Sequence, residues 1–262
     1  MLNNWLLKFG YYLIIVSWLL VIPASASEPT YDGIWFLGFN LENEVFRDVR
    51  VRQAVNQIIK KDNIQEIVSA EAVPIGVIPP GMLGYDPELK PVEYSLKEAR
   101  SLMKKAGLPL ADERLKNITL LHTDGVKTRA IVERLTNDLS NAGIKVYALE
   151  MRYSATDEWA EELIDGDFDI FLMGFKADIE KLYTEEASTP TIDSYGLVEP
   201  LFGSSGEANF TGYRNADVDL LLYQLAGLNK VLTSERHEKL QEINDILYQD
   251  LPVIPLFYIE QL

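Results

Sequence analysis

The amino-acid sequence predicts an α/β fold, with a largely parallel sheet and flanking helices. Along the middle of the chain, short apolar runs alternate with amphipathic segments of about 10 to 15 residues, which is typical of βαβ units. The run at residues 168–174 is almost entirely apolar, as expected for a strand buried on both faces. Because βαβ crossovers are right-handed and join parallel strands, we expect most strands to be parallel.

The first predicted elements are a strand, a helix and a loop. Residues 34–39 form an apolar run that fits a short buried strand. Asp48 is expected to cap the next helix, because it precedes an apolar stripe made of Val49, Val51, Ala54, Val55, Ile58 and Ile59. Residues 74–91 are rich in Pro and Gly and predict a long surface loop.

Caps and glycines delimit the later elements. Ser95 and Glu98 have the spacing of a capping box, and the helix that they begin is expected to end at Gly107. Residues 188–212 are rich in Gly, Ser and Thr. The other predictions are strands at 118–121, 144–151, 168–174 and 253–258, and helices at 128–142, 154–165, 215–227 and 233–250.

Composition limits the classes of function. The chain has 262 residues, 47% hydrophobic and 24% charged, which is the profile of a globular protein. Its net charge is −16 and no basic run occurs, so nucleic acid is not an expected partner, whereas the overall field favours a cationic or amine-bearing ligand. The sequence contains no cysteine, which excludes disulfides, thiolate catalysis, cysteine-bound zinc and lipid attachment at a cysteine.

Residues 1–26 are expected to be a signal peptide. Residues 9–26 carry no charge, follow Lys8 and end in Ala24-Ser25-Ala26, the small-x-small pattern that signal peptidase cuts. Cleavage would leave residues 27–262. The alternative is an uncleaved anchor, because an uncharged run of this length is at the lower bound for spanning a bilayer. Either way, the body is expected outside the cytoplasm, in the periplasm or outside the cell.

Motifs for catalysis and metal binding find no support. Asp165, Asp167 and Asp169 alternate as in a calcium loop, but Ile170 stands where that loop needs Gly, so we interpret the segment as a helix end followed by a strand. The two histidines, at 122 and 237, lack the spacing of a metal helix. No nucleophile elbow, phosphate loop or dinucleotide fingerprint occurs, so we expect neither an enzyme nor a cofactor.

One segment has the position of a binding site. Residues 174–178 follow the apolar strand at 168–174, and ligands of open α/β sheets lie beyond the carboxyl ends of strands. Asp178 at this place can hold an ammonium group through a charge-assisted hydrogen bond. The alternative is a solvated loop aspartate beside Lys176 and Glu180.

Several motifs together carry a family resemblance. They are FLGFN at 36–40, FRDVRVRQAV at 46–55, GYDP at 84–87, the helix at 95–107, FDI at 168–170, NFTGYRN at 209–215 and LPVIPL at 251–256. In this order they resemble the carboxyl-terminal half of the family 5 extracellular solute-binding proteins, which deliver peptides, nickel or other solutes to ABC importers.

The resemblance implies a periplasmic-binding-protein-like (type II) fold, in which two lobes close around a ligand. Residues of about 40–185 resemble the second lobe, and residues of about 215–262 resemble the segment that returns to the first lobe, so the two-lobe fold is expected to be incomplete. The implied ligand is a short peptide or other small amine-bearing solute. The implied partners are the membrane subunits of an ABC importer and, as an alternative, a separate first-lobe chain.

The resemblance also implies the residues of the ligand site. In dipeptide and oligopeptide binders, the aspartate of a Gly-Trp-x-x-Asp segment grips the amino terminus of the peptide, and Asp178 has that place here. Phe175 stands where the family has Trp. Asn209 and Tyr213 are further candidates for the cleft.

A second class of function stays open at this point. A truncated lobe that no longer binds solute would act as an interaction protein, docking on a partner lobe, a transporter or another envelope protein. This alternative predicts an exposed apolar patch on the last two helices, formed by Val218, Leu221, Leu222, Leu225, Leu240, Ile243 and Leu247.

Overall fold

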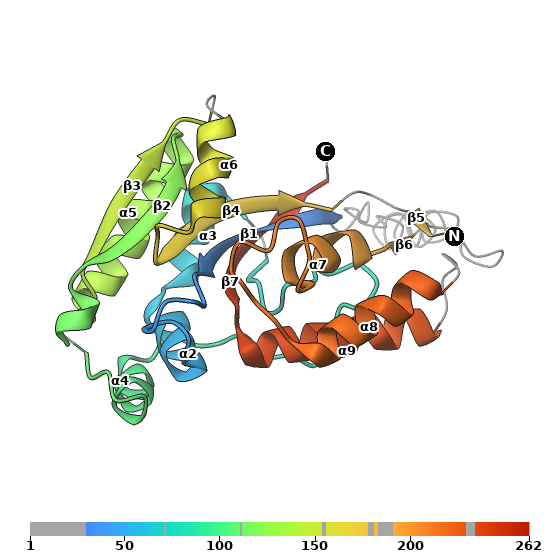
Figure 1. Ribbon diagram of the computed structural model, residues 1–262, viewed down its shortest axis with the longest axis horizontal. Helices are drawn as coiled ribbons and strands as arrows, with labels where there is room; N and C mark the ends of the chain where they lie inside the picture. The colour runs from blue at the N-terminus through green and yellow to red at the C-terminus, as the bar shows by residue number, and fades with distance from the viewer. Residues whose placement is uncertain are drawn as a thin grey trace, which may run out of the picture.

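A five-stranded sheet, in the order β3-β2-β4-β1-β7, forms the middle layer of the protein (Figure 1). The computed structural model describes residues 30–70, 72–110, 112–153, 156–177, 181–182, 191–228 and 234–261. The five strands are β1 (Tyr31–Phe39), β2 (Ile118–Thr123), β3 (Val146–Met151), β4 (Ile170–Lys176) and β7 (Val253–Glu260). A separate two-stranded sheet pairs β5 (Lys181–Leu182) with β6 (Thr191–Ile192).

The α/β class is confirmed, and the sheet is mixed rather than largely parallel. β3, β2 and β4 are parallel, as their helical crossovers predict. β1 is antiparallel to both β4 and β7. The sequence gives no crossover rule for β1 and β7, because they precede and follow the βαβ units, so the direction of these two strands could not be predicted.

Four helices cover one face of the sheet. They are α2 (Val49–Ile58), α3 (Lys61–Val68), α4 (Leu96–Lys105) and α5 (Val126–Asn141). Their buried side chains form one core with Leu37, Leu120 and Leu172 of the strands. These helices alternate apolar and polar residues at helical spacing, so each buries one stripe and exposes the other.

The other face is covered by α6 (Thr156–Asp165), α7 (Tyr195–Phe202), α8 (Ala216–Gly227) and α9 (Ser234–Asp250). Their apolar residues form a second core with Ile34, Phe36 and Phe171. The patch predicted for an interaction protein is therefore wrong for these helices. All seven residues are buried, at 8% exposure or less, because α8 and α9 pack on α7 and on the sheet: Val218, Leu221, Leu222, Leu225, Leu240, Ile243 and Leu247.

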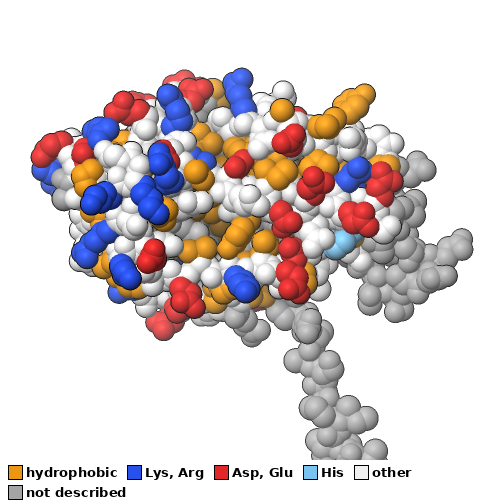
Figure 2. Space-filling view, turned by 90° about the horizontal axis from the view of Figure 1, so that it is seen from below, with side chains coloured by type: hydrophobic (Ala, Val, Ile, Leu, Met, Phe, Trp, Pro, Cys, Tyr) orange, Lys and Arg blue, Asp and Glu red, His pale blue; other side chains and the backbone are white. Residues whose placement is uncertain are grey.

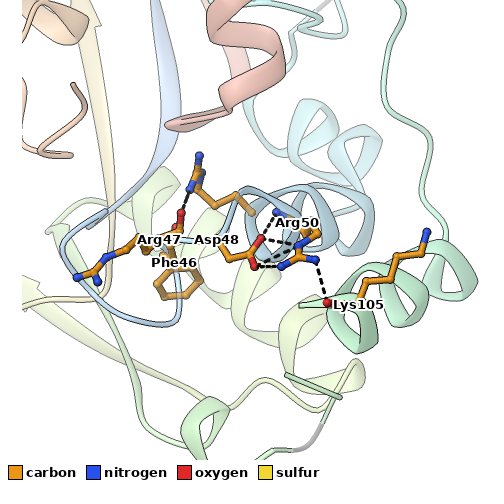
Figure 3. A network of polar contacts seen from close by, with 6 residues as sticks. Phe46, Arg47, Asp48, Arg50 and Lys105 are labelled. Atoms are coloured by element: carbon orange, nitrogen blue, oxygen red, sulfur yellow. Dashed lines mark hydrogen bonds and ion pairs between the residues drawn. The ribbon is translucent and has the colours of Figure 1, made fainter. Parts of the chain in front are cut away.

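A polar network ties the start of α2 to distant parts of the chain (Figure 3). Asp48 caps α2, accepting a 2.9 Å hydrogen bond from the amide of Arg50, and Arg50 also donates to the carbonyl of Lys105 at the end of α4. Buried Arg52 donates to the carbonyls of Phe46 (2.8 Å) and Leu251 (3.0 Å). The 46–55 motif thus joins the first helix to the junction between α9 and β7.

The long loop at 74–91 is held against α9 and β7. The hydroxyl of Tyr258 donates to the carbonyl of Gly76 (3.1 Å), and Nδ1 of His237 accepts the amide of Gly84 (3.1 Å). Burial raises the pKa of Tyr258, so this hydroxyl remains a donor at every physiological pH. The sequence predicts the loop but not these anchors, which come from residues more than 150 positions away.

The predicted helices and strands all occur, with ends shifted by a few residues. Five short elements of the described ranges were not predicted: α3, α7, β5, β6 and a 3-10 turn at Glu113–Leu115. The sequence did not indicate α7, because the segment contains Pro200 and its surroundings are rich in Gly and Ser. The helix buries one face, formed by Leu197, Val198, Leu201 and Phe202. Tertiary burial outweighs local propensity in such short elements.

Charge is distributed unevenly over the face seen in Figure 2. Lys and Arg side chains gather toward the end where α2 and α4 lie, and acidic side chains predominate over α8 and α9. None of the helices in the described ranges is long and apolar enough to cross a membrane. Residues 1–26, predicted to be a signal peptide, lie outside the described residues.

Candidate functional site

The candidate site lies where β2 ends and β4 continues. β2 pairs with β4 from Leu120 to His122, and β1 pairs with β4 as far as Lys176. Beyond Leu172, β4 therefore has a described strand partner on one side only. The amide of Ala177 donates to the carbonyl of Asp32 (2.7 Å), so strand alternation directs the backbone groups of Gly174 and Lys176 toward the open edge.

A hollow of about 530 Å³ opens at this edge. It is assembled from β1, β7, the carboxyl ends of β2 and β4, and the starts of α5 and α6, so its residues are far apart in sequence. Its lining consists of Trp35, Thr123, Asp124, Thr128, Tyr153, Trp159, Leu172, Met173, Gly174, Lys176 and Ile259. The volume lies within the usual range for small-ligand pockets.

Trp35 is a fixed wall of the hollow. Its indole lies on the backbone of Gly174, where an added Cβ would come within 2.5 Å of the ring. It also stacks on Phe257 of β7, with ring centroids 5.7 Å apart and an interplanar angle of 13°. Gly174 is therefore required by the close approach of an aromatic ring, and Trp35 is held on two sides.

The amino terminus of α5 faces the same region. Its N-cap is Gly125, with φ 139°, and no side chain caps the helix. Thr128 is 8% exposed and lines both the 530 Å³ hollow and a neighbouring one of about 270 Å³. Its hydroxyl makes no hydrogen bond with any described residue. Free helix amides and a free hydroxyl are suited to a carboxylate.

The charged groups of the site already have protein partners. Nζ of Lys176 lies 3.1 Å from Oδ2 of Asp32, which is 6% exposed at its side chain. Oδ1 of Asp124 accepts the amide of Tyr153 at 2.9 Å. These contacts leave the aromatic walls, the open edge of β4 and the start of α5 as the groups still available to a ligand.

Comparisons with known proteins agree with this architecture. Residues 19–184 match the family described as bacterial extracellular solute-binding proteins, family 5 Middle. This chain belongs to that family. The family consists of solute-binding proteins rather than enzymes, in agreement with the expectation that this chain is not an enzyme.

Individual members of the family are similar over much of this chain. A heme-binding protein A of Haemophilus influenzae is 25% identical over 86% of this chain and 39% of its own length. A glutathione-binding protein of Escherichia coli is 27% identical over 84% of this chain and 41% of its own length. The chain thus spans about 40% of the length of these relatives.

Solved structures show the same fold. The periplasmic binding protein DppA of Helicobacter pylori, solved in complex with a peptide, matches 88% of this chain and 43% of its own chain, with a TM-score of 0.74 and 20% identity. The murein tripeptide binding protein of Escherichia coli matches 96% of this chain and 46% of its own, with a TM-score of 0.73 and 19% identity.

The family-derived site residues that the structure describes lie at two ends of the sheet. Asp178 lies outside the described residues, directly after Ala177 at the end of β4. Phe175 is half-buried on β4 and packs on the core formed with α7, α8 and α9. Asn209 and Tyr213 belong to a loop joined to the opposite end of β1, where the amide of Leu41 donates to the carbonyl of Thr211 (2.9 Å).

Asn209 and Tyr213 make structural contacts in that loop. Asn209 donates to the carbonyls of Gly203 (2.9 Å) and Tyr213 (2.8 Å), and it lines a separate hollow of about 360 Å³. The buried hydroxyl of Tyr213 donates to Asp250 (2.6 Å), and burial raises its pKa. The structure therefore does not bring these two residues together with Phe175, from which they are separated by the length of β4.

The interpretation of residues 165–169 as a helix end is confirmed. Gly166 has φ 69°, as expected for the glycine after a helix, and Asp169 accepts the amide of Thr119 at 2.7 Å. Burial, with a smaller contribution from Asp167, raises the pKa of Asp169. Within the described ranges, no group of three potential ligands is arranged to hold a metal ion.

Sequence reasoning missed most of the hollow. Trp35, Thr128, Tyr153 and Trp159 come from four separate segments, and no local motif connects them. The rule that ligands lie beyond the carboxyl ends of strands would have pointed to Asp124, which follows β2, as it pointed to Asp178 after β4.

Proposed function

We propose that this protein binds short peptides in an extended conformation and delivers them to an ABC importer. The observation that carries the proposal is the open edge of β4 at Gly174 and Lys176, which borders the hollow. An extended peptide adds to such an edge through main-chain hydrogen bonds, with its side chains in neighbouring pockets. Relatives named for peptides and glutathione support this class of ligand.

Each end of the peptide has a suitable group nearby. Asp178 follows β4 and is the proposed contact for the amino terminus, through an ion pair. The uncapped start of α5, with the free hydroxyl of Thr128, is the proposed contact for a carboxylate. The net charge of −16 attracts the ammonium end of a peptide from a distance.

The cellular setting is part of the same proposal. The family is extracellular, and the predicted signal in residues 1–26 would export the chain to the periplasm or cell surface, with anchoring if the signal stays uncut. The importer membrane subunits are the proposed partners. We infer that residues of about 40–185 act as the second lobe of the binding fold, with the final segment returning toward a first lobe.

Docking on a partner without solute binding has less support. Its predicted patch on α8 and α9 is buried in the described residues. The chain does span less than half of its relatives, so a first lobe on a separate chain is compatible with peptide binding and would enclose the ligand.

The proposal is tested by thermal unfolding of the full chain with trialanine and with N-acetyl-trialanine. A ligand that binds only the native state raises the midpoint. Trialanine should raise it, and the acetylated peptide should raise it less, because it lacks the ammonium group.

Asp178→Ala should cost about 2 to 5 kcal/mol of binding free energy for a buried charge pair. Asp165→Ala, at the last residue of α6 before the start of β4, is the matched control; equal midpoints with and without either peptide would reject the proposal.

A further inference from the structure

We propose that the 530 Å³ hollow is a subsite for an aromatic side chain of the ligand, and that Trp35, Tyr153 and Trp159 determine this preference. The proposal rests on the proposed function, because a peptide paired with β4 supplies the side chain. It adds a preference for peptides with an aromatic side chain. The main-chain contacts and the contacts with the two ends cannot create such a preference, because these groups are the same in every peptide.

The walls of the hollow are mainly aromatic and apolar. Tyr153 is 68% exposed, and Trp159 is half-buried beside it, so both rings have surface left for a ligand. Leu172 and Met173 add apolar surface from β4. Aromatic rings dominate binding energetics because each buries a large apolar area and stacks with other rings.

The polar groups of the hollow are largely engaged by the protein. Lys176 is paired with Asp32, and Asp124 accepts the amide of Tyr153. An apolar ring leaves both of these contacts in place. The hydroxyl of Thr128 belongs to the part of the site next to α5.

The register of a bound peptide would direct a side chain into the hollow. A strand added to the open edge of β4 lies about 4.8 Å from it, and its side chains alternate between the two faces of the sheet. Met173 faces the core formed with α6 to α9, whereas Leu172 and Trp35 face the other core. One set of ligand side chains therefore passes beside Trp159 and the other beside Trp35.

Trp35 is rigid enough to discriminate between side chains. The ring is fixed between the backbone of Gly174 and the ring of Phe257, so it cannot swing aside to enlarge or close the hollow. It lines both the 530 Å³ hollow and the 270 Å³ one, together with Thr128 and Ile259. A wall that does not move makes the shape of the subsite, and hence its preference, a fixed property of the fold.

The chain offers a direct optical probe of this subsite. Its four tryptophans are Trp5, Trp18, Trp35 and Trp159, and the last two both line the hollow. In the full chain with Trp5→Phe and Trp18→Phe, tryptophan fluorescence reports on the hollow alone. The probes are N-acetyl-phenylalanine amide and N-acetyl-alanine amide, which lack charged ends and so do not depend on Asp178 or α5.

The expected result is a saturable fluorescence change with the phenylalanine amide and a weaker or absent one with the alanine amide. Tyr153→Ser should weaken binding of the phenylalanine amide by about three- to tenfold, the range for one aromatic pair. Tyr153 is exposed, so this variant should fold normally, which circular dichroism verifies. Tyr223→Ser, at an exposed aromatic of α8, is the matched control and should change nothing.

Equal responses to the two amides, or equal effects of Tyr153→Ser and Tyr223→Ser, would overturn the subsite. Its failure is distinguishable from that of the proposed function. Peptides that raise the unfolding midpoint without any preference for phenylalanine would leave the function standing and remove the subsite. Saturable binding of the phenylalanine amide without any peptide binding would support an aromatic site in the hollow and remove the proposed function.

Discussion

Arg52, a residue of the 46–55 motif, stabilises the fold by donating hydrogen bonds to backbone carbonyls. It is 5% exposed, and its guanidinium donates to carbonyls of the 46–47 turn and of the α9–β7 junction. Arg52→Lys keeps the charge but loses the fork of donors, so buried carbonyls remain unsatisfied. We expect a loss of about 2 to 4 kcal/mol of unfolding free energy, measured by urea denaturation. Arg50→Lys, at an exposed position, is the control and should have little effect.

Asp245 should make stability depend on pH. Burial, followed by the neighbouring Asp86 and Glu242, raises the pKa of the Asp245 carboxyl, and its Oδ1 is buried without a hydrogen-bond partner. Because the folded pKa exceeds the unfolded one, the stabilising contribution is fully present below the unfolded pKa and is lost as pH rises through the folded pKa. At neutral pH, the ionised Asp245 therefore weakens the fold.

The corresponding prediction is that Asp245→Asn raises the thermal midpoint at pH 7 and has a smaller effect near pH 4. Midpoints of both proteins between pH 4 and pH 8 check this expectation. Glu238→Gln removes an exposed charge from the same helix and serves as the control. A lower midpoint for Asp245→Asn at pH 7 would contradict the assignment.

Among the helices, α5 allows a test that leaves the fold intact. Val126 is the first residue of α5, is 85% exposed and has no capping side chain before it. Proline is well tolerated at this position and removes one amide donor. Val126→Pro should therefore weaken binding of peptides with a free carboxylate several-fold, and binding of the corresponding peptide amides much less.

The matched control places a proline at the start of another helix. Ala216 is the exposed first residue of α8, where the side chain of Asn215 caps the next two amides. Ala216→Pro should leave peptide binding unchanged. Titrations of both variants with trialanine and trialanine amide compare the two helix starts, and an equal loss in both variants would remove α5 from the site.

Most elements could be predicted because their signals are local. Asp48, Ser95 and Asn215 cap their helices as the sequence indicates, and Gly166 ends α6. The direction of β1 could not be predicted, because it depends on pairing with β4 and β7, which lie more than 130 residues later. The same reason applies to the hollow, whose walls meet only after the sheet has formed.

The sequence pointed to the carboxyl end of β4 as a binding position, and the residues assigned to it remain a prediction. The carboxyl end of β4 was identified from the apolar run and the residues after it, and the hollow lies at that end. Asn209 and Tyr213 were assigned by resemblance, and the structure places them at the opposite end of β1 in a hydrogen-bonded loop. The role of Trp35 could not be predicted from the sequence, because its contact with Gly174 forms only when β1 and β4 pair.

The whole molecule has two cores that share one sheet. β1 is the element that joins them, since it lends Ile34 and Phe36 to one core and Leu37 and Phe39 to the other. It is also the strand that joins β4 to β7. Loss of either core would expose one face of β1, so the two cores should unfold together rather than in sequence.

The two tryptophans of the hollow can test this cooperativity, because Trp35 packs on one core and Trp159 on the other. In the background with Trp5→Phe and Trp18→Phe, Trp35→Phe leaves a probe of the α6 to α9 side, and Trp159→Phe leaves a probe of the α2 to α5 side. In each variant, the urea transition seen by fluorescence should coincide with that seen by circular dichroism. A fluorescence midpoint that departs from the circular dichroism midpoint in either variant would show that one face unfolds first. In that case, β1 would not couple the two cores.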